Sequence, residues 1–272
     1  MKWAKYSTRG KSFGPCNICG AVGKLTDDHV PPKGCPRISS VQMHLLFRVL
    51  SIGSALSSGR QAQGGVKYRT LCGVCNNSRL GHEYDPDLIR LCKDIDRFLS
   101  ALDAGIVLPS NILARTHPQR VLRSVIGHTL AAAVGRRADG NWDRDLVSYF
   151  LNSDLSFPDC ARVYYWVYPF QQQVLIRDAC FVSLLLSDKG KSPTLFMCIK
   201  FYPLAFLITD NRDSNYRFDL PCLSDFGSVP LDKEVEVPFN LKNIPSKAWP
   251  EAPSKQHFAV FGGNPLFASL PS

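Results

Sequence analysis

The sequence contains no long apolar run. Its most apolar stretch, TLFMCIKFYPLAFLIT (residues 194–209), is shorter than the about 20 residues that a membrane-spanning helix needs, and it includes Lys200 and Pro203. The first residues, MKWAKYSTRGKSFG, are basic but are followed by no apolar core of the kind found in secretory signals. We therefore expect a soluble cytoplasmic protein without a membrane partner.

The sequence also has no internal repeat and no low-complexity tract, and its cysteines are too sparse for a disulfide scaffold. There are 10 cysteines in 272 residues, and four of them form two C-x2-C pairs, CNIC and CGVC. Small secreted scaffolds are shorter and denser in cysteine, whereas paired cysteines in an intracellular chain are typical of zinc sites. The length is sufficient for one large domain or two modest ones.

Acidic residues are scarce in the first third of the chain. Residues 1–94 contain 14 Lys and Arg against 6 Asp and Glu, whereas residues 95–272 contain 18 against 17. This asymmetry indicates that the N-terminal part contacts a polyanion, of which nucleic acid is the commonest. The alternative is a basic surface that serves solubility alone.

Residue patterns predict the elements of the N-terminal part. We expect a short strand at 21–25, then the loop DDHVPPKG, and a strand at 66–72, where apolar or β-branched residues alternate with Lys and Arg. We expect an apolar helix at 41–57, a flexible loop at 57–65, and a helix after the second cysteine pair with an interruption near Gly81–Pro86.

The remainder of the chain has a different character. Apolar residues at helical spacing predict a helix at 117–137 and a shorter one at 143–151. Runs rich in β-branched and aromatic residues then predict strands between 161 and 209. The sequence thus predicts an α+β protein: a small module at 1–94 with an inserted segment at 36–65, and a larger domain at 95–272 with helices followed by a mainly antiparallel sheet.

The two cysteine pairs have the spacing of a zinc site. Four thiolates surround one zinc ion tetrahedrally, and such a site is structural because no position stays open for a substrate. We expect Cys16, Cys19, Cys72 and Cys75 to be the ligands, with the segment between the pairs as an insertion. Unrelated buried thiols or a redox pair are the alternatives.

The order of the motifs carries a family resemblance. The stretch CNICGAVGKLTDDHVPP is followed by YRTLCGVCNNSRLG, which gives the pattern C-x2-C, DH-x-P, C-x2-C-N-x2-R. This arrangement resembles the HNH endonucleases, which have a ββα-metal fold. The resemblance covers about residues 14–82, and its short motifs are specific only in combination. It implies a zinc-stabilised nuclease module that hydrolyses phosphodiester bonds in DNA.

The resemblance also implies roles for individual residues. It makes His29 the general base that takes a proton from water, and it makes Asp28 and Asn76 the ligands of a catalytic Mg²⁺ or Mn²⁺ ion. Arg79, one helical turn after Asn76, contacts the scissile phosphate. Neighbouring residues of a strand point to opposite faces, so Asp28 and His29 would serve the metal and the water, respectively.

The sequence departs from the family at Lys67, where an asparagine usually braces the loop that carries the histidine. Other candidates have simpler interpretations. His82 and Glu83 are interpreted as a solvated helix end, with further metal ligands or proton-relay groups as the alternative. Asp27 is interpreted as an exposed turn residue, with a helper carboxylate as the alternative. The rest are interpreted as structural, with no chemical role: Cys35, His44, Asn77 and His128.

Two functions therefore compete. The first is a metal-dependent HNH endonuclease that nicks or cleaves DNA, whose domain at 95–272 sets specificity, docks other proteins or regulates the nuclease. Nuclease modules with such a partner domain resemble effectors of bacterial anti-phage defence. The second is a zinc-stabilised nucleic-acid-binding or adaptor protein with a degenerate HNH site, which Lys67 favours.

Overall fold

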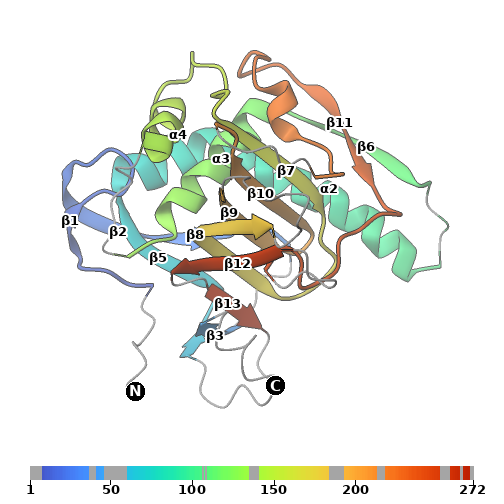
Figure 1. Ribbon diagram of the computed structural model, residues 1–272, viewed down its shortest axis with the longest axis horizontal. Helices are drawn as coiled ribbons and strands as arrows, with labels where there is room; N and C mark the ends of the chain where they lie inside the picture. Colours follow the sequence, from blue (N-terminus) through green and yellow to red (C-terminus); the bar gives the residue numbers. More distant parts are fainter. Residues whose placement is uncertain are drawn as a thin grey trace.

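The computed structural model describes residues 8–36, 41–45, 60–105, 107, 109–134, 141–183, 193–212, 218–251, 258–263 and 266–269. Helices and antiparallel sheets both contribute substantially, so the predicted α+β class is confirmed at this level. Figure 1 shows the helices gathered over the upper part of the molecule and the strands of the largest sheet crossing beneath them.

The N-terminal sheet has three strands in the order β1–β2–β5: β1 (Phe13–Pro15), β2 (Val22–Val30) and β5 (Val66–Cys72). The strand at 66–72 is confirmed. β2 is longer than expected and includes Asp27, Asp28 and His29, so these three residues lie in a strand and not in a loop. Pairing with β5 from Leu25 to Val30 supplies the backbone partners that extend the strand.

The helix that follows β5 differs from the expected one. The segment η1 (Val74–Tyr84) is a π-helix that passes directly into α2 (Asp85–Asp103). The chain stays helical through Gly81–Pro86, where we expected an interruption, but π-helical hydrogen bonding changes to α-helical between Tyr84 and Asp85, next to Pro86. Asn77 is exposed and lies four residues inside the boundary residue Gly73, so it does not start the helix.

The apolar segment expected to be a helix at 41–57 begins as a strand. β3 (Val41–Leu45) pairs with β4 (Arg60–Ala62) and with β13 (Leu266–Ser269). The helix prediction is wrong for 41–45, and residues 46–57 lie outside the described part of the chain. The predicted loop at 57–65 contains β4. A short apolar run fits either a strand or a helix, and here pairing partners distant in sequence decide for a strand.

The largest sheet is antiparallel, with the order β4–β3–β13–β8–β9–β10–β7 and β12 attached to β8. Its strands outside the N-terminal part include β7 (Ala161–Val167), β8 (Gln173–Ser183), β9 (Thr194–Phe201), β10 (Leu204–Asp210) and β12 (Phe258–Gly263). Alternate residues of β7 belong to two apolar clusters: Val163 and Tyr165 to one, Tyr164 and Trp166 to the other. Both faces of this strand are therefore buried, which explains why its sequence is a nearly continuous apolar run.

Two predicted helices are confirmed with adjusted ends: α3 (Pro118–Ala131) and α4 (Asn141–Leu151). α3 is buried along its length and contacts α2, η1, β2 and β5, so it lies between the N-terminal sheet and the rest of the core. A separate two-stranded sheet joins β6 (Asn111–Thr116) to β11 (Val235–Asn240), and a 3-10 turn, η3, spans Leu223–Phe226.

The division into 1–94 and 95–272 stays a prediction. One apolar cluster contains residues from both parts, for example Leu71 of β5 and Val125 of α3, and β3 pairs with β13 across the same division. None of the helices in the described part of the chain is both long and apolar enough to cross a membrane.

Candidate functional site

The four predicted zinc ligands meet at the end of the three-stranded sheet. Cys16 follows β1, Cys19 lies in the next turn, Cys72 ends β5, and Cys75 lies in the first turn of η1. Their sulfur atoms all lie within 4.8 Å of one another. The predicted clustering is confirmed, and its signal was the spacing of the two C-x2-C pairs.

The donor set fits a tetrahedral metal ion such as zinc. With zinc–sulfur bonds of about 2.3 Å, the sulfur atoms of a tetrahedral site lie about 3.8 Å apart. The Sγ atoms of Cys19 and Cys72 are 3.6 Å apart, close to that value. The hydrogen bond between Cys16 and Cys75 lowers the pKa of Cys16 to about 4 and raises the pKa of Cys75, so one thiolate of the pair is favoured before a metal binds. Such an ion would join the first turn to β5 and η1.

His29 lies on β2 on the outward face of the sheet. Its side chain is half-buried, and burial together with the nearby positive charges of Lys67 and Lys33 lowers its pKa. The imidazole is therefore neutral near pH 7, the form that accepts a proton. His29 thus has the protonation state that a general base needs, although its catalytic role stays a prediction.

Asp28 points to the opposite face of β2, into the core, where its side chain is 3% exposed. Its Oδ2 lies 3.0 Å from Nδ1 of His128 on α3, and Nε2 of the same ring lies 3.0 Å from Oδ1 of Asp85. Ser124 donates a hydrogen bond of 2.6 Å to that Asp85 oxygen. Asp28 therefore belongs to a buried polar chain that links β2, α3 and the first residue of α2.

His128 was expected to be an ordinary residue of the helix, and the structure assigns it a specific partner on each ring nitrogen. Burial alone would lower its pKa, but the carboxylates of Asp28 and Asp85 raise it well above the usual value. An imidazolium with two N–H donors satisfies both carboxylates. No pattern in the sequence indicates this contact, because His128 lies 100 positions from Asp28.

Asn76 and Arg79, expected on one helical face, have different side-chain partners in the structure, and the contact of Arg79 with phosphate stays a prediction. The side-chain amide of Asn76 donates hydrogen bonds to Oγ1 of Thr26 at 2.9 Å and to the carbonyl of Asp27 at 3.2 Å. Arg79 lies beside the hydroxyl of Tyr84. Burial raises the pKa of that hydroxyl, and Arg79 opposes the rise. The π-helical hydrogen bonds of η1 widen each turn, so residues three positions apart no longer align.

Asp28 and Asn76, the expected ligands of Mg²⁺ or Mn²⁺, each have a protein partner in this structure. Among the described residues, the four cysteines form the one group of three or more Cys, His, Asp or Glu whose ligand atoms are close enough to hold a metal ion. Asp28 is engaged by His128 in the core, and Asn76 donates to β2. For Asp28 to bind an ion, the ion would have to replace this His128 contact. Its role as a metal ligand stays a prediction.

Charged side chains surround His29 on the outward face of the sheet. In the pairing of β2 with β5, Lys67 lies opposite His29 and Arg69 lies opposite Asp27. Arg69 donates two hydrogen bonds to the carboxylate of Asp27, at 2.7 and 3.3 Å, and Arg9 approaches the same carboxylate at 3.7 Å. Asp27, expected in an exposed turn, is thus a half-buried strand residue whose pKa is lowered by Arg69.

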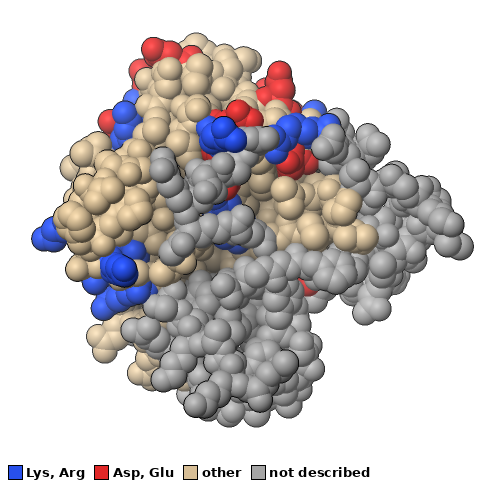
Figure 2. Space-filling model, turned by 60° about the vertical axis from the view of Figure 1, so that its left-hand side comes forward, with Lys and Arg blue, Asp and Glu red and all other residues tan. Residues whose placement is uncertain are grey.

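Basic groups are also visible on the molecular surface. Figure 2 brings forward the side of the molecule that carries β1 and β2 in Figure 1, and shows Lys and Arg in separate groups there, with Asp and Glu mostly toward the upper part. This distribution agrees with the basic composition of residues 1–94.

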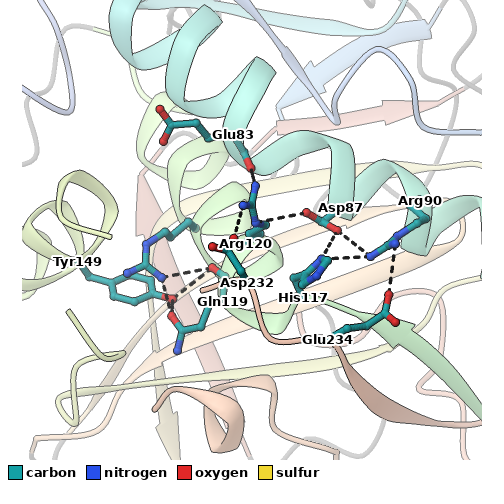
Figure 3. A network of polar contacts seen from close by, with 10 residues as sticks. Glu83, Asp87, Arg90, His117, Gln119, Arg120, Tyr149, Asp232 and Glu234 are labelled. Atoms are coloured by element: carbon teal, nitrogen blue, oxygen red, sulfur yellow. Dashed lines mark hydrogen bonds and ion pairs between the residues drawn. The ribbon is translucent and has the colours of Figure 1, made fainter. Parts of the chain in front are cut away.

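A second polar network, which the sequence did not indicate, joins α2 to the start of α3 (Figure 3). Nδ1 of His117 lies 2.8 Å from Asp87, Arg90 contacts both Asp87 and Glu234, and Arg120 contacts Asp87 and Asp232. Basic groups and carboxylates alternate through the network. We interpret it as a structural brace, because its charged groups contact one another across α2, α3 and the segment at 232–234.

Comparison of the chain with models of protein families, with curated proteins and with solved structures finds no match. The function is therefore inferred from the site's own residues.

Proposed function

We propose that the chain is an endonuclease of the HNH type that hydrolyses phosphodiester bonds in DNA, with His29 as the general base. The observation that carries the proposal is the placement of His29: a half-buried, neutral imidazole on a sheet face with Lys67 opposite and Lys33 nearby, on the strand that follows the first cysteine pair. A base among cations suits a polyanionic substrate, because the cations attract phosphate while the base stays unprotonated.

The chemistry assigned to the chain is a hydrolysis. His29 takes a proton from a water molecule, and the water oxygen forms a bond to phosphorus. The bond from phosphorus to the leaving 3′ oxygen of the deoxyribose breaks, and that oxygen takes a proton from solvent. The thiolate cluster would fix β2, β5 and η1 relative to one another, and thereby the position of His29.

Three parts of the proposal do not rest on the geometry of the site. Dependence on Mg²⁺ or Mn²⁺ is one, since Asp28 contacts His128 and Asn76 donates to Thr26 in this structure. A role in anti-phage defence, with other proteins docked on residues 95–272, is another. Action in the cytoplasm is the third, and it agrees with the reduced cysteines that a thiolate metal site requires.

The test is cleavage of supercoiled plasmid by the purified chain, with Mg²⁺, with Mn²⁺ and with EDTA. We expect nicked product from the wild type and none from His29→Ala, with metal content and melting temperature unchanged. His82→Ala is the matched control, because this exposed histidine lies on η1 outside the proposed site and should leave cleavage intact. Equal cleavage by His29→Ala would reject His29 as the base.

A second function is favoured by one observation. Asp28, which the family resemblance assigns to the catalytic ion, is buried and bound to His128. That geometry supports a zinc-stabilised nucleic-acid-binding or adaptor protein with an inactive site. Such a protein would bind plasmid DNA with an affinity that falls steeply with salt, and it would produce no nicks with any divalent ion.

A further inference from the structure

The outward face of the β2–β5 pair is defined by two pairs of opposed residues. Asp27 lies opposite Arg69, and His29 lies opposite Lys67. Opposed residues of an antiparallel pair project to the same face, with Cβ atoms about 4.5–5.5 Å apart. The burial pattern agrees, because the four outward residues are half-buried whereas Asp28 and its partner Tyr68 are buried on the other face.

The two cations on this face differ in their partners. Arg69 is held by Asp27 through two hydrogen bonds, so its charge is neutralised locally. Within the part of the chain that the structure describes, no carboxylate lies within ion-pair distance of Lys67, and its charge acts at longer range on the imidazole of His29 and the carboxylate of Asp27. Lys67 is therefore a cation available to an anion that approaches His29.

Hydrolysis of a phosphodiester needs such a cation. When water adds to phosphorus, negative charge builds up on the non-bridging oxygens, and a fixed positive group beside them stabilises the transition state more than the substrate. The carboxylate expected to hold a metal ion for this purpose, Asp28, is engaged on the opposite face. On the face of His29, Lys67 of β5 is the residue paired with the base.

We propose that Lys67 is a catalytic residue whose ammonium contacts a non-bridging oxygen of the phosphate that His29 serves. The inference rests on the proposed nuclease function and deepens it. It also gives a reason for the departure from the family pattern. Lys67 occupies the position of the usual bracing asparagine, and its positive charge contacts the substrate instead of bracing the loop. The bracing role is then separate, and Asn76 fills part of it through its hydrogen bonds to Thr26 and Asp27.

The experiment measures single-turnover cleavage of a labelled duplex by the full chain and by Lys67→Ala, Lys67→Arg and Lys67→Gln. Lys24→Ala is the matched control, because Lys24 is an exposed lysine of β2 at the opposite end of the strand. Loss of one group that stabilises transition-state charge lowers the rate by about 100- to 1,000-fold. We expect that loss for Lys67→Ala, partial recovery for Lys67→Arg, and wild-type rates for Lys24→Ala.

A second readout separates catalysis from general attraction to DNA. In the His29→Ala background, where the duplex stays intact, Lys67→Ala should change the dissociation constant by no more than Lys24→Ala does. A rate that survives Lys67→Ala, or a loss confined to KM and DNA affinity, overturns the role of Lys67 while the nuclease function stands. Absence of cleavage by the wild type overturns both. Lys67→Gln, which keeps the stem of the side chain, replaces Lys67→Ala if the alanine variant melts at a lower temperature.

Discussion

The ring of His128 and the carboxylate of Asp28 form a buried contact of 3.0 Å between residues 100 positions apart in the chain. The second ring nitrogen makes an equal contact with Asp85, where α2 begins. One side chain of α3 thus fixes both the strand that carries His29 and the helix that continues from η1. Because Asp28 and His29 are neighbours on one strand, the orientation of the buried residue determines that the proposed base faces outward.

Removal of His128 should destabilise the fold strongly. His128→Gln leaves the carboxylates of Asp28 and Asp85 buried without a cation, and breaking a buried charge pair typically costs about 3–5 kcal/mol. Urea unfolding followed by circular dichroism measures the loss. The exposed histidine His82 provides the control, since His82→Gln should change the free energy of unfolding by less than about 0.5 kcal/mol.

The same network allows a second comparison. The double variant Asp28→Asn with His128→Gln removes one of the two carboxylates that His128→Gln leaves without a cation. Part of the free energy of unfolding lost in the single variant should therefore be recovered. A single variant His128→Gln that unfolds at the wild-type urea concentration would show that the three groups contribute nothing measurable to stability.

The cysteine cluster predicts a metal content of one ion per chain. Cys72→Ser removes one of four sulfur ligands, so we expect lost zinc and a lower melting temperature, because binding of a structural metal contributes directly to folding. Elemental analysis of the purified protein gives the ratio of zinc to chain. Cys180→Ser is the control, a half-buried cysteine on β8 outside the cluster. Full zinc occupancy in Cys72→Ser would contradict the assignment.

The pair of Asp27 and Arg69 predicts a dependence of stability on pH. The hydrogen bonds from Arg69 lower the pKa of Asp27 in the folded chain below its unfolded value of about 3.9. The pair therefore stabilises the fold above that pH, and the contribution disappears as the pH falls and the carboxylate becomes protonated. Arg69→Gln should lower the urea midpoint at pH 6, and its midpoint should approach that of the wild type below about pH 3.9.

The control for this prediction is Arg97→Gln. Arg97 pairs with Asp94 on the surface of α2, and its side chain is 77% exposed, against 28% for Arg69. An exposed ion pair of this kind contributes little to the free energy of unfolding. Its removal should therefore leave the dependence of the urea midpoint on pH nearly unchanged. Parallel curves for Arg69→Gln and the wild type from pH 6 to pH 3 would refute the assigned coupling.

Local sequence patterns predicted the elements whose structure depends on residues close together in the chain. In α3, residues at helical spacing such as Val121, Val125 and Leu130 are buried as the amphipathic pattern indicated. The two cysteine pairs meet as their spacing indicated, the first in the turn after β1 and the second where β5 passes into η1. The strands between 161 and 209 were evident from β-branched and aromatic residues.

The remaining features depend on partners that the sequence does not reveal. Residues 41–45 fit either a helix or a strand, and pairing with residues 266–269 decides for the strand. The burial of Asp28 depends on His128, which no local pattern links to it. The segment η1, which carries Asn76 and Arg79, is π-helical, and spacing rules for an α-helix do not anticipate that.

The absence of a side chain at Gly127 allows η1 and α4 to pack closely against α3. A Cβ atom at this position would lie 2.5 Å from the ring of Phe150 on α4 and 2.6 Å from the side chain of Leu80 on η1. Both neighbours are fully buried and have no free space into which to move. Alanine is favoured over glycine in a helix by about 1 kcal/mol, but overpacking a core costs about 1–3 kcal/mol. Gly127→Ala should therefore lower the free energy of unfolding.

Its control is Gly23→Ala on β2, where a Cβ atom would meet nothing within 4 Å. Urea unfolding should show the wild-type midpoint for Gly23→Ala and a lower midpoint for Gly127→Ala. Since η1 carries Asn76, which holds β2 through Thr26 and Asp27, a displaced η1 should also reduce cleavage by the folded fraction of Gly127→Ala. A Gly127→Ala variant as stable as the wild type would mean that Leu80 and Phe150 move apart freely, and that the position of η1 is not fixed by this contact.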